Sequence, residues 1–287
     1  MTVGIIGLGI MGGAYGRNLL SANVTVFGTD PDETAREKLL SAGGEVFVKI
    51  GDWISECNLI ILSLANPAVL HQVCSELSQF LKPGQVVVET GTFALADKIK
   101  ARAEIESCGA ILLDCPVSGT GAQAAVGDLL MMASGELSVI ESIKPLLAHF
   151  TKSVLFAGDF GAGSHLKYVA NHAVALHNAA AAEVLNYAVK LGLDPDLVYQ
   201  MLSTGAGQSR MLDLRMPLMI SGEYEPPTAN LKMFEKDLSV IGADVKRVRA
   251  ETPMLDVVEK LYSKALDVLP NTFDTAAVYE VYKSNSK

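Results

Sequence analysis

The sequence predicts an α/β fold in two domains: an N-terminal doubly wound, mainly parallel sheet, followed by an all-α C-terminal domain. Three observations predict this fold. Short β-rich runs alternate with helical segments as far as about residue 155, the pattern changes to helices alone after Gly158, and one long helical pattern starts near Ser164. We place the domains at 1–160 and 161–287, with the long helix as an interdomain helix.

Composition limits the classes of protein to consider. The chain has 287 residues, is 49% hydrophobic and has a formal net charge of -9, so it has room for a sizeable core and no general attraction for nucleic acid or anionic membranes. Its four cysteines form no CxxC pair, so we expect no disulfide framework and no metal site. No apolar run is long enough to span a membrane, and no basic segment precedes the first one. We therefore expect a cytoplasmic protein.

The strand candidates are short and several are apolar throughout, as expected of strands that helices cover on both faces. They lie at residues 3–7, 24–28, 59–64, 85–90, 110–117, 129–134 and 153–158.

The first strand runs into a GxGxxG motif that opens a helix. In the usual reading, Gly7 permits a tight turn, Gly9 lets the backbone approach a pyrophosphate, and Gly12 lets the helix pack on the strand. Ile10 and Met11 then supply amides of the first helical turn, which faces the phosphates. The motif alone is weak evidence, but its place between a strand and a helix predicts a dinucleotide site.

Asp30 follows the second predicted strand, 18 residues after Gly12. A carboxylate there can hydrogen-bond the ribose hydroxyls of NAD and would repel the 2′-phosphate of NADP. The two positions before Asp30 are Gly28 and Thr29, so neither carries an arginine that could neutralise that phosphate. Arg36 lies a helical turn further on. This pattern favours NAD as the cofactor without excluding NADP.

The stretch "DCPVSGTGAQAAVGDL" follows a later strand and precedes a helical turn. Ser118, Gly119 and Thr120 offer hydroxyls and free backbone N–H groups at that helix start, a suitable cradle for a small carboxylate. A polar loop with an ordinary helix cap is the alternative reading.

The long helix is expected from about Ser164 to Leu191, about 40 Å at 1.5 Å per residue. It is apolar on almost every side, so every side must be covered. The second domain has few residues with which to enclose it, and we therefore expect a homodimer or homotetramer built around this helix.

Four stretches together, "GLGIMG", "DCPVSGTGAQAAVGDL", "GAGSHLKYVANH" and "FEKDL", resemble the signature regions of the β-hydroxyacid dehydrogenase family. That family includes 3-hydroxyisobutyrate dehydrogenase, tartronate semialdehyde reductase and L-threonate dehydrogenase. The resemblance covers essentially the whole chain. It implies a Rossmann domain, a helical domain like that of 6-phosphogluconate dehydrogenase, and NAD(P)-dependent interconversion of a small 3-hydroxy acid and its 3-oxo acid or semialdehyde.

The resemblance also implies roles for individual residues. The family's catalytic lysine matches Lys167, its partner asparagine matches Asn171, and its substrate-binding Ser-Gly-Gly matches the cradle described above, with Thr120 in place of the second glycine. The turn "ETGT" at residues 89–92 departs from the commoner aspartate-containing turn. Further cofactor contacts are implied for Leu64, Ala65, Asn66, Thr92 and Lys236.

The chemistry expected of Lys167 agrees with that role. Its apolar neighbours disfavour the charged form of the lysine, which suits it to exchange a proton near neutral pH. In alcohol oxidation the neutral amine would accept the hydroxyl proton as hydride leaves, and in reduction it would return it. Asn171, at i+4, can hydrogen-bond both the lysine and a substrate hydroxyl. The alternative is a lysine that extends to the solvent and does no chemistry.

Two other functions stay open at this point. The same scaffold could reduce an imine, although relatives with that activity usually replace the lysine. It could also serve as a non-catalytic, dinucleotide-binding scaffold protein, which an intact Lys167–Asn171 pair disfavours.

Overall fold

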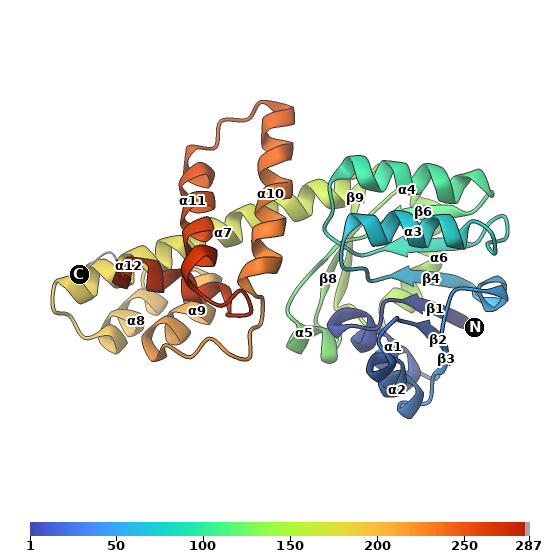
Figure 1. Cartoon of the computed structure of the whole chain (residues 1–287), viewed down its shortest axis with the longest axis horizontal. Helices are drawn as coiled ribbons and strands as arrows, with labels where there is room; N and C mark the ends of the chain where they lie inside the picture. Colours follow the sequence, from blue (N-terminus) through green and yellow to red (C-terminus); the bar gives the residue numbers. More distant parts are fainter. Residues whose placement is uncertain (285–287) are drawn as a thin grey trace. The chain divides into compact units, whose positions relative to one another are not determined.

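The computed structural model describes residues 1–284, and they form two compact units (Figure 1). The first unit spans Met1–Lys167, and the second begins at Tyr168. The expected functional boundary between residues 160 and 161 stays a prediction, because compactness does not show which residues bind the cofactor.

The predicted doubly wound sheet is confirmed in the first unit. Its first six strands are parallel in the order β3-β2-β1-β4-β5-β6, which is the strand order of a Rossmann fold. The carboxyl ends of β1, β4, β5 and β6 therefore lie along one edge of the sheet. These strands are β1 (Thr2–Ile6), β2 (Thr25–Thr29), β3 (Glu45–Phe47), β4 (Leu59–Leu62), β5 (Val86–Glu89) and β6 (Ile111–Asp114).

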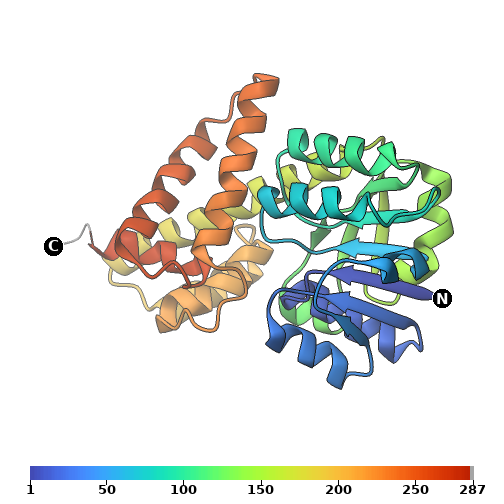
Figure 2. The same cartoon turned by 45° about the vertical axis from the view of Figure 1, so that its right-hand side comes forward.

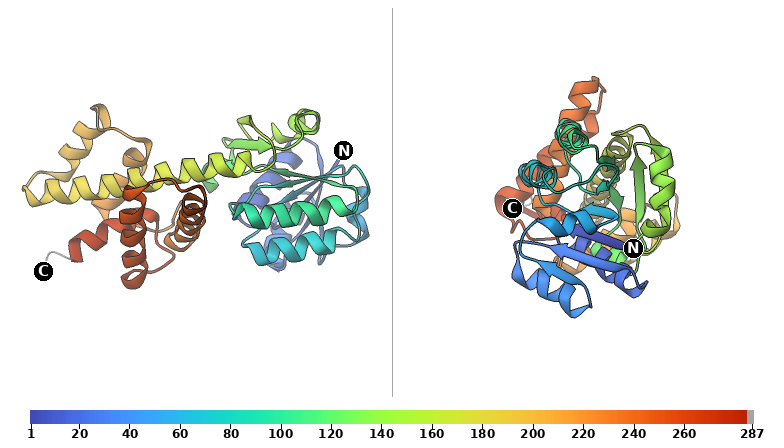
Figure 3. Two further views of the ribbon diagram at one scale, coloured as in Figure 1. Left: turned by 90° about the horizontal axis from the view of Figure 1, so that it is seen from above. Right: turned by 90° about the vertical axis from the view of Figure 1, so that its right-hand side faces the viewer.

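Helices cover both faces of this sheet (Figures 1 and 3). Alternate strand residues point to opposite faces, so Ile5 packs in one buried cluster with α1, α2, α5 and α6, whereas Ile6 packs in another with α3 and α4. Both faces are buried, which explains the continuously apolar strands. The helices are α1 (Ile10–Ser21), α2 (Glu33–Ser41), α3 (Pro67–Leu77), α4 (Leu95–Ser107), α5 (Gly121–Ala125) and α6 (Leu137–Leu147), with a 3-10 helix η1 (Asp52–Glu56).

The end of the sheet differs from the sequence prediction. The single strand expected at 110–117 is divided into β6 and a short β7 (Val117–Ser118), because Pro116 between them has no N–H for a strand ladder. β7 and β6 both pair antiparallel with β8 (Leu130–Ser134), and β9 (Ser153–Gly158) pairs parallel with β8. The short strand β3 has no counterpart in the prediction.

The long helix is α7 (Ala162–Lys190), and it agrees with the expected span to within two residues. Its first six residues belong to the first unit and the rest to the second. Elsewhere the described residues of the second unit form helices, and α10 and α11 lie side by side (Figure 2). These elements are α8 (Pro195–Thr204), α9 (Arg210–Ser221), α10 (Leu231–Val248), α11 (Pro253–Val268), η2 (Thr275–Tyr279) and α12 (Glu280–Ser284).

The core of the second unit forms around the small residues of α7. Ala175 and Ala182 are fully buried and let neighbouring helices approach closely. Elsewhere on the same helix, apolar side chains are exposed in the single chain: Val169 is 68% exposed and Tyr187 65%. No helix among residues 1–284 is long and apolar enough to cross a membrane.

Candidate active site

The glycine loop lies between β1 and α1, and two of its glycines are required by packing. Gly7 has φ +90°, and a Cβ there would lie 2.2 Å from the carbonyl oxygen of Ser63. A Cβ on Gly12 would lie 1.9 Å from the carbonyl oxygen of Gly7. Around the Cβ position of Gly9, by contrast, nothing among residues 1–284 lies within 4 Å, apart from its chain neighbours. The chain itself therefore leaves open the place where a pyrophosphate would approach the backbone.

Asp30 holds this loop in place. Its Oδ2 accepts a hydrogen bond from the N–H of Leu8 at 2.7 Å, and its Oδ1 accepts one from the N–H of Asp32 at 2.8 Å. Each carboxylate oxygen can accept more than one hydrogen bond, so both can still receive ribose hydroxyls. The Nη1 of Arg36 donates to the carbonyl of Asp30 at 2.6 Å, closer to this turn than its place in the sequence suggested.

The loop after β7 lies against the start of α1. A Cβ on Gly121 would lie 2.6 Å from the Cγ2 of Ile10. The Nδ2 of Asn18, on α1, donates to the carbonyl of Ala124 at 2.8 Å. The structure thus brings the predicted phosphate loop and the predicted carboxylate cradle together.

The cradle has fewer free amides than the sequence suggested. Thr120 caps α5, and its N–H donates to the Oε1 of Gln123 at 3.0 Å in a capping box. The expectation of a free N–H at Thr120 is therefore wrong, because Gln123 lies at the third helical position and can reach back. Gly119 has φ +144°, and a Cβ there would lie 2.4 Å from Leu129, so glycine is required.

The turns after β4 and β5 lie at the same edge of the sheet. Leu64 is half-buried against Gly7, Ala65 is exposed, and the side chain of Asn66 caps α3 by accepting from the N–H of Val69 at 3.0 Å. Thr92 is half-buried in the turn after β5.

Lys167 is half-buried, rather than enclosed as its apolar neighbours suggested. Leu166 is 38% exposed and Val169 68% exposed, so the apolar residues beside the lysine do not surround its ammonium in this chain. Apolar neighbours in sequence spread around the whole circumference of a helix, so they do not show which side is covered.

Asn171 is buried one helical turn after Lys167 and is held from α10. Its Nδ2 donates to the Oδ2 of Asp237 at 2.8 Å, and the Nζ of Lys236 lies 3.0 Å from the Oδ1 of the same carboxylate. The amide is therefore oriented with its nitrogen toward Asp237, so its carbonyl oxygen can accept a proton donor elsewhere.

A buried charged cluster that the sequence analysis missed lies at the ends of β5 and β6. Glu89 and Asp114 are partners in the parallel ladder, and both side chains contact the ammonium of Lys98, from α4. The Nζ of Lys98 lies 2.6 Å from Glu89 Oε2, 2.7 Å from Asp114 Oδ1 and 2.7 Å from the carbonyl of Gly91. All three side chains are fully buried.

Asp114 extends this cluster to the first turn of α7. Its Oδ2 accepts from the N–H of Ser164 at 2.8 Å, and its Oδ1 accepts from the Ser164 hydroxyl at 2.9 Å. The hydroxyl of Ser134 also donates to Oδ2, at 3.0 Å. A carboxylate at a helix N-terminus is electrostatically favourable, and here it fixes the turn that precedes Lys167.

The cluster divides its charges unequally. Burial raises the pKa of Glu89 above its usual value despite the neighbouring Lys98. Burial would also raise the pKa of Asp114, but Lys98 and the hydrogen bonds from Ser164 outweigh it and hold that pKa below its usual range. Burial opposes the charged form of Lys98, yet the two carboxylates raise its pKa. Asp114 and Lys98 therefore form the stable ion pair, and Glu89 is the member that protonates most readily.

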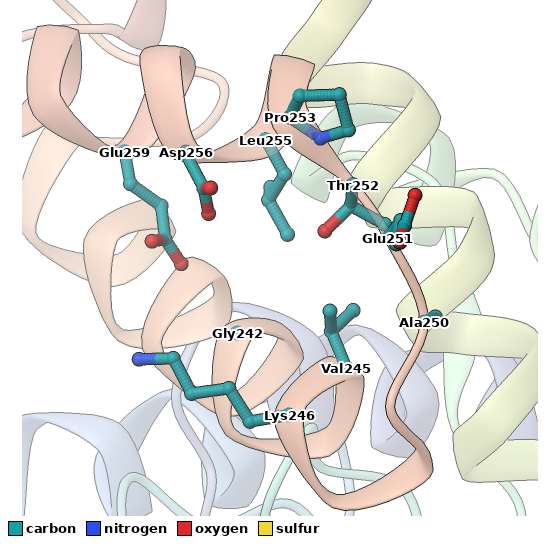
Figure 4. A pocket seen from close by; sticks show the side chains of 10 residues that line it. All are labelled: Gly242, Val245, Lys246, Ala250, Glu251, Thr252, Pro253, Leu255, Asp256 and Glu259. Atoms are coloured by element: carbon teal, nitrogen blue, oxygen red, sulfur yellow. The ribbon is translucent and has the colours of Figure 1, made fainter.

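A separate cavity of about 400 Å³ lies in the second unit, between α10 and α11 (Figure 4). Asp256, Glu259 and Glu251 line it together with Lys246. None of the predicted site residues lines this cavity. Among residues 1–284 no group of three or more His, Cys, Asp or Glu side chains is placed to hold a metal ion.

Two family models match this sequence and together cover nearly the whole chain. Residues 2–158 match the NAD-binding domain of 6-phosphogluconate dehydrogenase, and residues 161–282 match the NAD-binding domain of NADP-dependent 3-hydroxyisobutyrate dehydrogenase. The chain belongs to the β-hydroxyacid dehydrogenase family. It is an NAD(P)-binding oxidoreductase of the hydroxyacid dehydrogenase type.

Individual relatives cover the full length of the chain. An L-threonate dehydrogenase from Pectobacterium atrosepticum is 28% identical over 285 residues, which are 98% of this chain and 93% of the relative. The crystal structure of a 3-hydroxyisobutyrate dehydrogenase from Salmonella typhimurium superimposes with a TM-score of 0.89 at 29% identity, covering 98% of this chain and 99% of that one. An imine reductase from Pseudomonas sp. is more distant, with a TM-score of 0.63 at 18% identity over 97% of this chain and 98% of that one, and shares the fold.

The sequence contains a pattern from which Lys98 could have been recognised as a buried residue. Lys98, Ala101 and Ile105 are spaced three and four residues apart, so they share the buried face of α4. A lysine on an apolar face needs a buried anionic partner, so this spacing marks Lys98 as a candidate for a buried ion pair without identifying the partner. The unusual turn "ETGT" is part of this pairing, since Glu89 also accepts from the N–H of Gly91 at 2.6 Å.

We expect Glu89→Gln to gain stability relative to the native dehydrogenase as the pH rises. A pKa that is raised in the folded state means that the fold binds the proton more tightly than the unfolded chain, so native stability is lost as the pH rises above the ordinary Glu value of about 4.3. Glutamine does not titrate. Urea unfolding between about pH 4.5 and 7.5 should show the free energy of unfolding of the variant, minus that of the native protein, increasing with pH.

The matched control is Glu106→Gln, which neutralises an exposed carboxylate paired with Arg102 near the end of α4. Its difference from the native protein should change little over this range, because exposed ion pairs contribute little. A difference for Glu89→Gln that decreases with pH would contradict the raised pKa.

Proposed function

We propose that this dehydrogenase interconverts a small 3-hydroxy acid and its 3-oxo acid or semialdehyde, with Lys167 as the general acid and base. The observation that supports it most is the combination of family membership over both halves of the chain with Lys167 and Asn171 one turn apart on α7. NAD(P)+, when bound, supplies the hydride acceptor.

We assign the cofactor to the edge of the sheet that carries the glycine loop. The open space at Gly9 and the unpaired amides at the start of α1 fit a pyrophosphate, and Asp30 is placed to accept hydrogen bonds from the ribose. The residues that we propose to contact the cofactor are Gly7, Gly9, Ile10, Met11, Gly12, Asp30, Leu64, Ala65, Asn66, Thr92 and Lys236.

The chain's own residues then divide the chemistry. Lys167, when neutral, accepts the proton of the substrate hydroxyl during oxidation and returns it during reduction. Asn171, whose nitrogen is held by Asp237, offers its carbonyl oxygen to the lysine or to the substrate hydroxyl. Ser118 and Gly119 bind the substrate carboxylate. Thr120 completes the loop, with its amide donating to the Oε1 of Gln123 and its hydroxyl accepting from the N–H of Gln123.

We propose NAD as the preferred cofactor, and Asp30→Asn tests this preference. Asparagine can still accept the hydrogen bond from the N–H of Leu8, but it lacks the charge that repels a 2′-phosphate. The ratio of kcat/KM for NADP to that for NAD should rise about tenfold or more, since one unfavourable charge contact is worth about 1–2 kcal/mol.

The control for this variant is Glu33→Gln, which removes a neighbouring exposed charge that makes no contact with the glycine loop among those described. It should change the cofactor ratio by less than about twofold. If Asp30→Asn leaves the ratio unchanged, Arg36, which lies at the carbonyl of Asp30, becomes the residue to vary.

The experiment that tests the function is turnover of three- and four-carbon hydroxy acids, 3-hydroxyisobutyrate and L-threonate among them, with NAD and with NADP. A cyclic imine with NADPH belongs in the same panel. Oxidation of at least one hydroxy acid supports the proposal, reduction of the imine alone supports the imine reductase, and cofactor binding without any turnover supports the scaffold protein.

We also propose that the dehydrogenase is a cytoplasmic homodimer or homotetramer. The exposed apolar residues of α7, Val169 and Tyr187 among them, support an assembly that covers this helix. Sedimentation at micromolar concentration tests it, and a monomer at all concentrations would contradict it.

A further inference from the structure

The ammonium of Lys98 contacts three different segments of the first unit. It donates hydrogen bonds to the Oδ1 of Asp114 and to the carbonyl of Gly91, each at 2.7 Å, and forms an ion pair with the Oε2 of Glu89 at 2.6 Å. A buried ammonium held by three groups in this way has a single position, and so do the groups that it contacts.

One of those contacts fixes the turn that carries Thr92. The carbonyl of Gly91 accepts from Lys98, while the N–H of the same residue donates to Glu89 at 2.6 Å. The peptide units on both sides of Gly91 are therefore held by buried charged groups, and Thr92 follows immediately.

The contact of Lys98 with Asp114 fixes the start of α7. Lys98 holds the Oδ1 of Asp114, and both oxygens of this carboxylate accept from Ser164. The backbone at Gly163 is close-packed as well, since a Cβ there would lie 2.3 Å from the carbonyl of Met132. Ser164 is three residues before Lys167 on the same helix, so a shift of its turn displaces the lysine.

We propose that Lys98 is a positioning residue for the dehydrogenase site: it holds the turn of Thr92 and, through Asp114, the first turn of the helix that carries Lys167. The catalytic part of this inference rests on the proposed function. The alternative is that Lys98 does no more than neutralise two buried carboxylates and stabilise the sheet.

Lys98→Met alone does not separate these readings, because Glu89 and Asp114 would be left side by side without a cation and much of the protein would unfold. Lys98→Met combined with Glu89→Gln leaves one buried carboxylate. That carboxylate, Asp114, keeps three donors: the N–H and hydroxyl of Ser164 and the hydroxyl of Ser134. Glu89→Gln by itself is the reference for this double variant.

The first measurement is amide hydrogen exchange, which needs no activity. In the double variant, exchange at residues 91–93 and 163–167 should be at least about tenfold faster than in Glu89→Gln, while the strand interiors are unchanged. A lysine that only stabilises the sheet would speed exchange throughout the first unit in equal measure. Exchange that is unchanged in these two segments, or raised uniformly, overturns the proposal.

The second measurement separates kcat from cofactor binding. Misplacement of Thr92 and Lys167 should lower kcat at least about tenfold. The Kd for NADH should rise by a smaller factor than kcat falls, since Thr92 is one cofactor contact among many and the glycine loop on β1 and α1 is untouched. If the variant were only partly folded, turnover and the number of NADH-binding sites per chain would fall by the same factor. Turnover equal to that of Glu89→Gln overturns the positioning role.

The matched control is Lys100→Met, the same substitution on the exposed side of α4, and it should change neither measurement. If the native protein turns over no hydroxy acid in the panel, the proposed function fails, and the exchange measurement still decides whether Lys98 holds the two turns.

Discussion

Replacing Lys167 by alanine should lower turnover at least about a hundredfold while the cofactor still binds. General acid–base catalysis by a positioned side chain contributes about 10²–10⁴-fold, and the alanine variant lacks the amine that is proposed to accept the hydroxyl proton. Steady-state kinetics with the best hydroxy acid of the panel, together with fluorescence titration of NADH, measure the two quantities separately. The Kd for NADH should stay within about threefold of the native value, because the glycine loop is untouched.

Lys190 provides the control, because it lies on the exposed end of the same helix. Lys190→Ala removes an identical side chain and should leave turnover within about twofold of native. Half-burial of Lys167 makes the experiment decisive, since the loss of a half-exposed lysine costs little stability. Turnover of Lys167→Ala within tenfold of native would show that the lysine serves no proton transfer, and the solvent-facing reading of this residue would then hold.

The sequence was sufficient to predict the Rossmann sheet, because the evidence for it is local. The apolar strands, the GxGxxG turn and Asp30 each depend on residues that are neighbours along the chain or along one strand. The long helix was predictable for the same reason, since helical periodicity is read within one segment.

What the sequence could not supply depends on pairing between distant segments. Lys98 is 16 residues from Asp114 and belongs to another element, so its charge partners became clear only from the strand register that sets Glu89 beside Asp114. The free amide expected at Thr120 was wrong because the choice between a free amide and one held by Gln123 depends on a side-chain rotamer. Burial of Lys167 was overestimated because composition does not show which face of a helix is covered.

Gly9→Ala should weaken cofactor binding about tenfold to a hundredfold in a protein that still folds. Gly9 has φ -62°, which any residue can adopt, and apart from its chain neighbours no described residue lies within 4 Å of the new methyl group. The stability cost is that of an alanine at a helix N-cap, about 1 kcal/mol. A pyrophosphate that approaches the backbone there would meet the methyl group, and a steric misfit of about 1–3 kcal/mol corresponds to this loss of affinity.

Gly12→Ala provides the contrast within the same motif. Its Cβ would lie 1.9 Å from the carbonyl of Gly7, so the variant should be destabilised even without cofactor. Gly51→Ala, at an extended position with its nearest neighbour at 3.8 Å, should change neither stability nor affinity. Thermal unfolding and NADH titration of the three variants therefore separate packing from ligand contact. If Gly9→Ala binds NADH as tightly as Gly51→Ala does, the pyrophosphate does not approach Gly9, and the cofactor assignment at this loop is wrong.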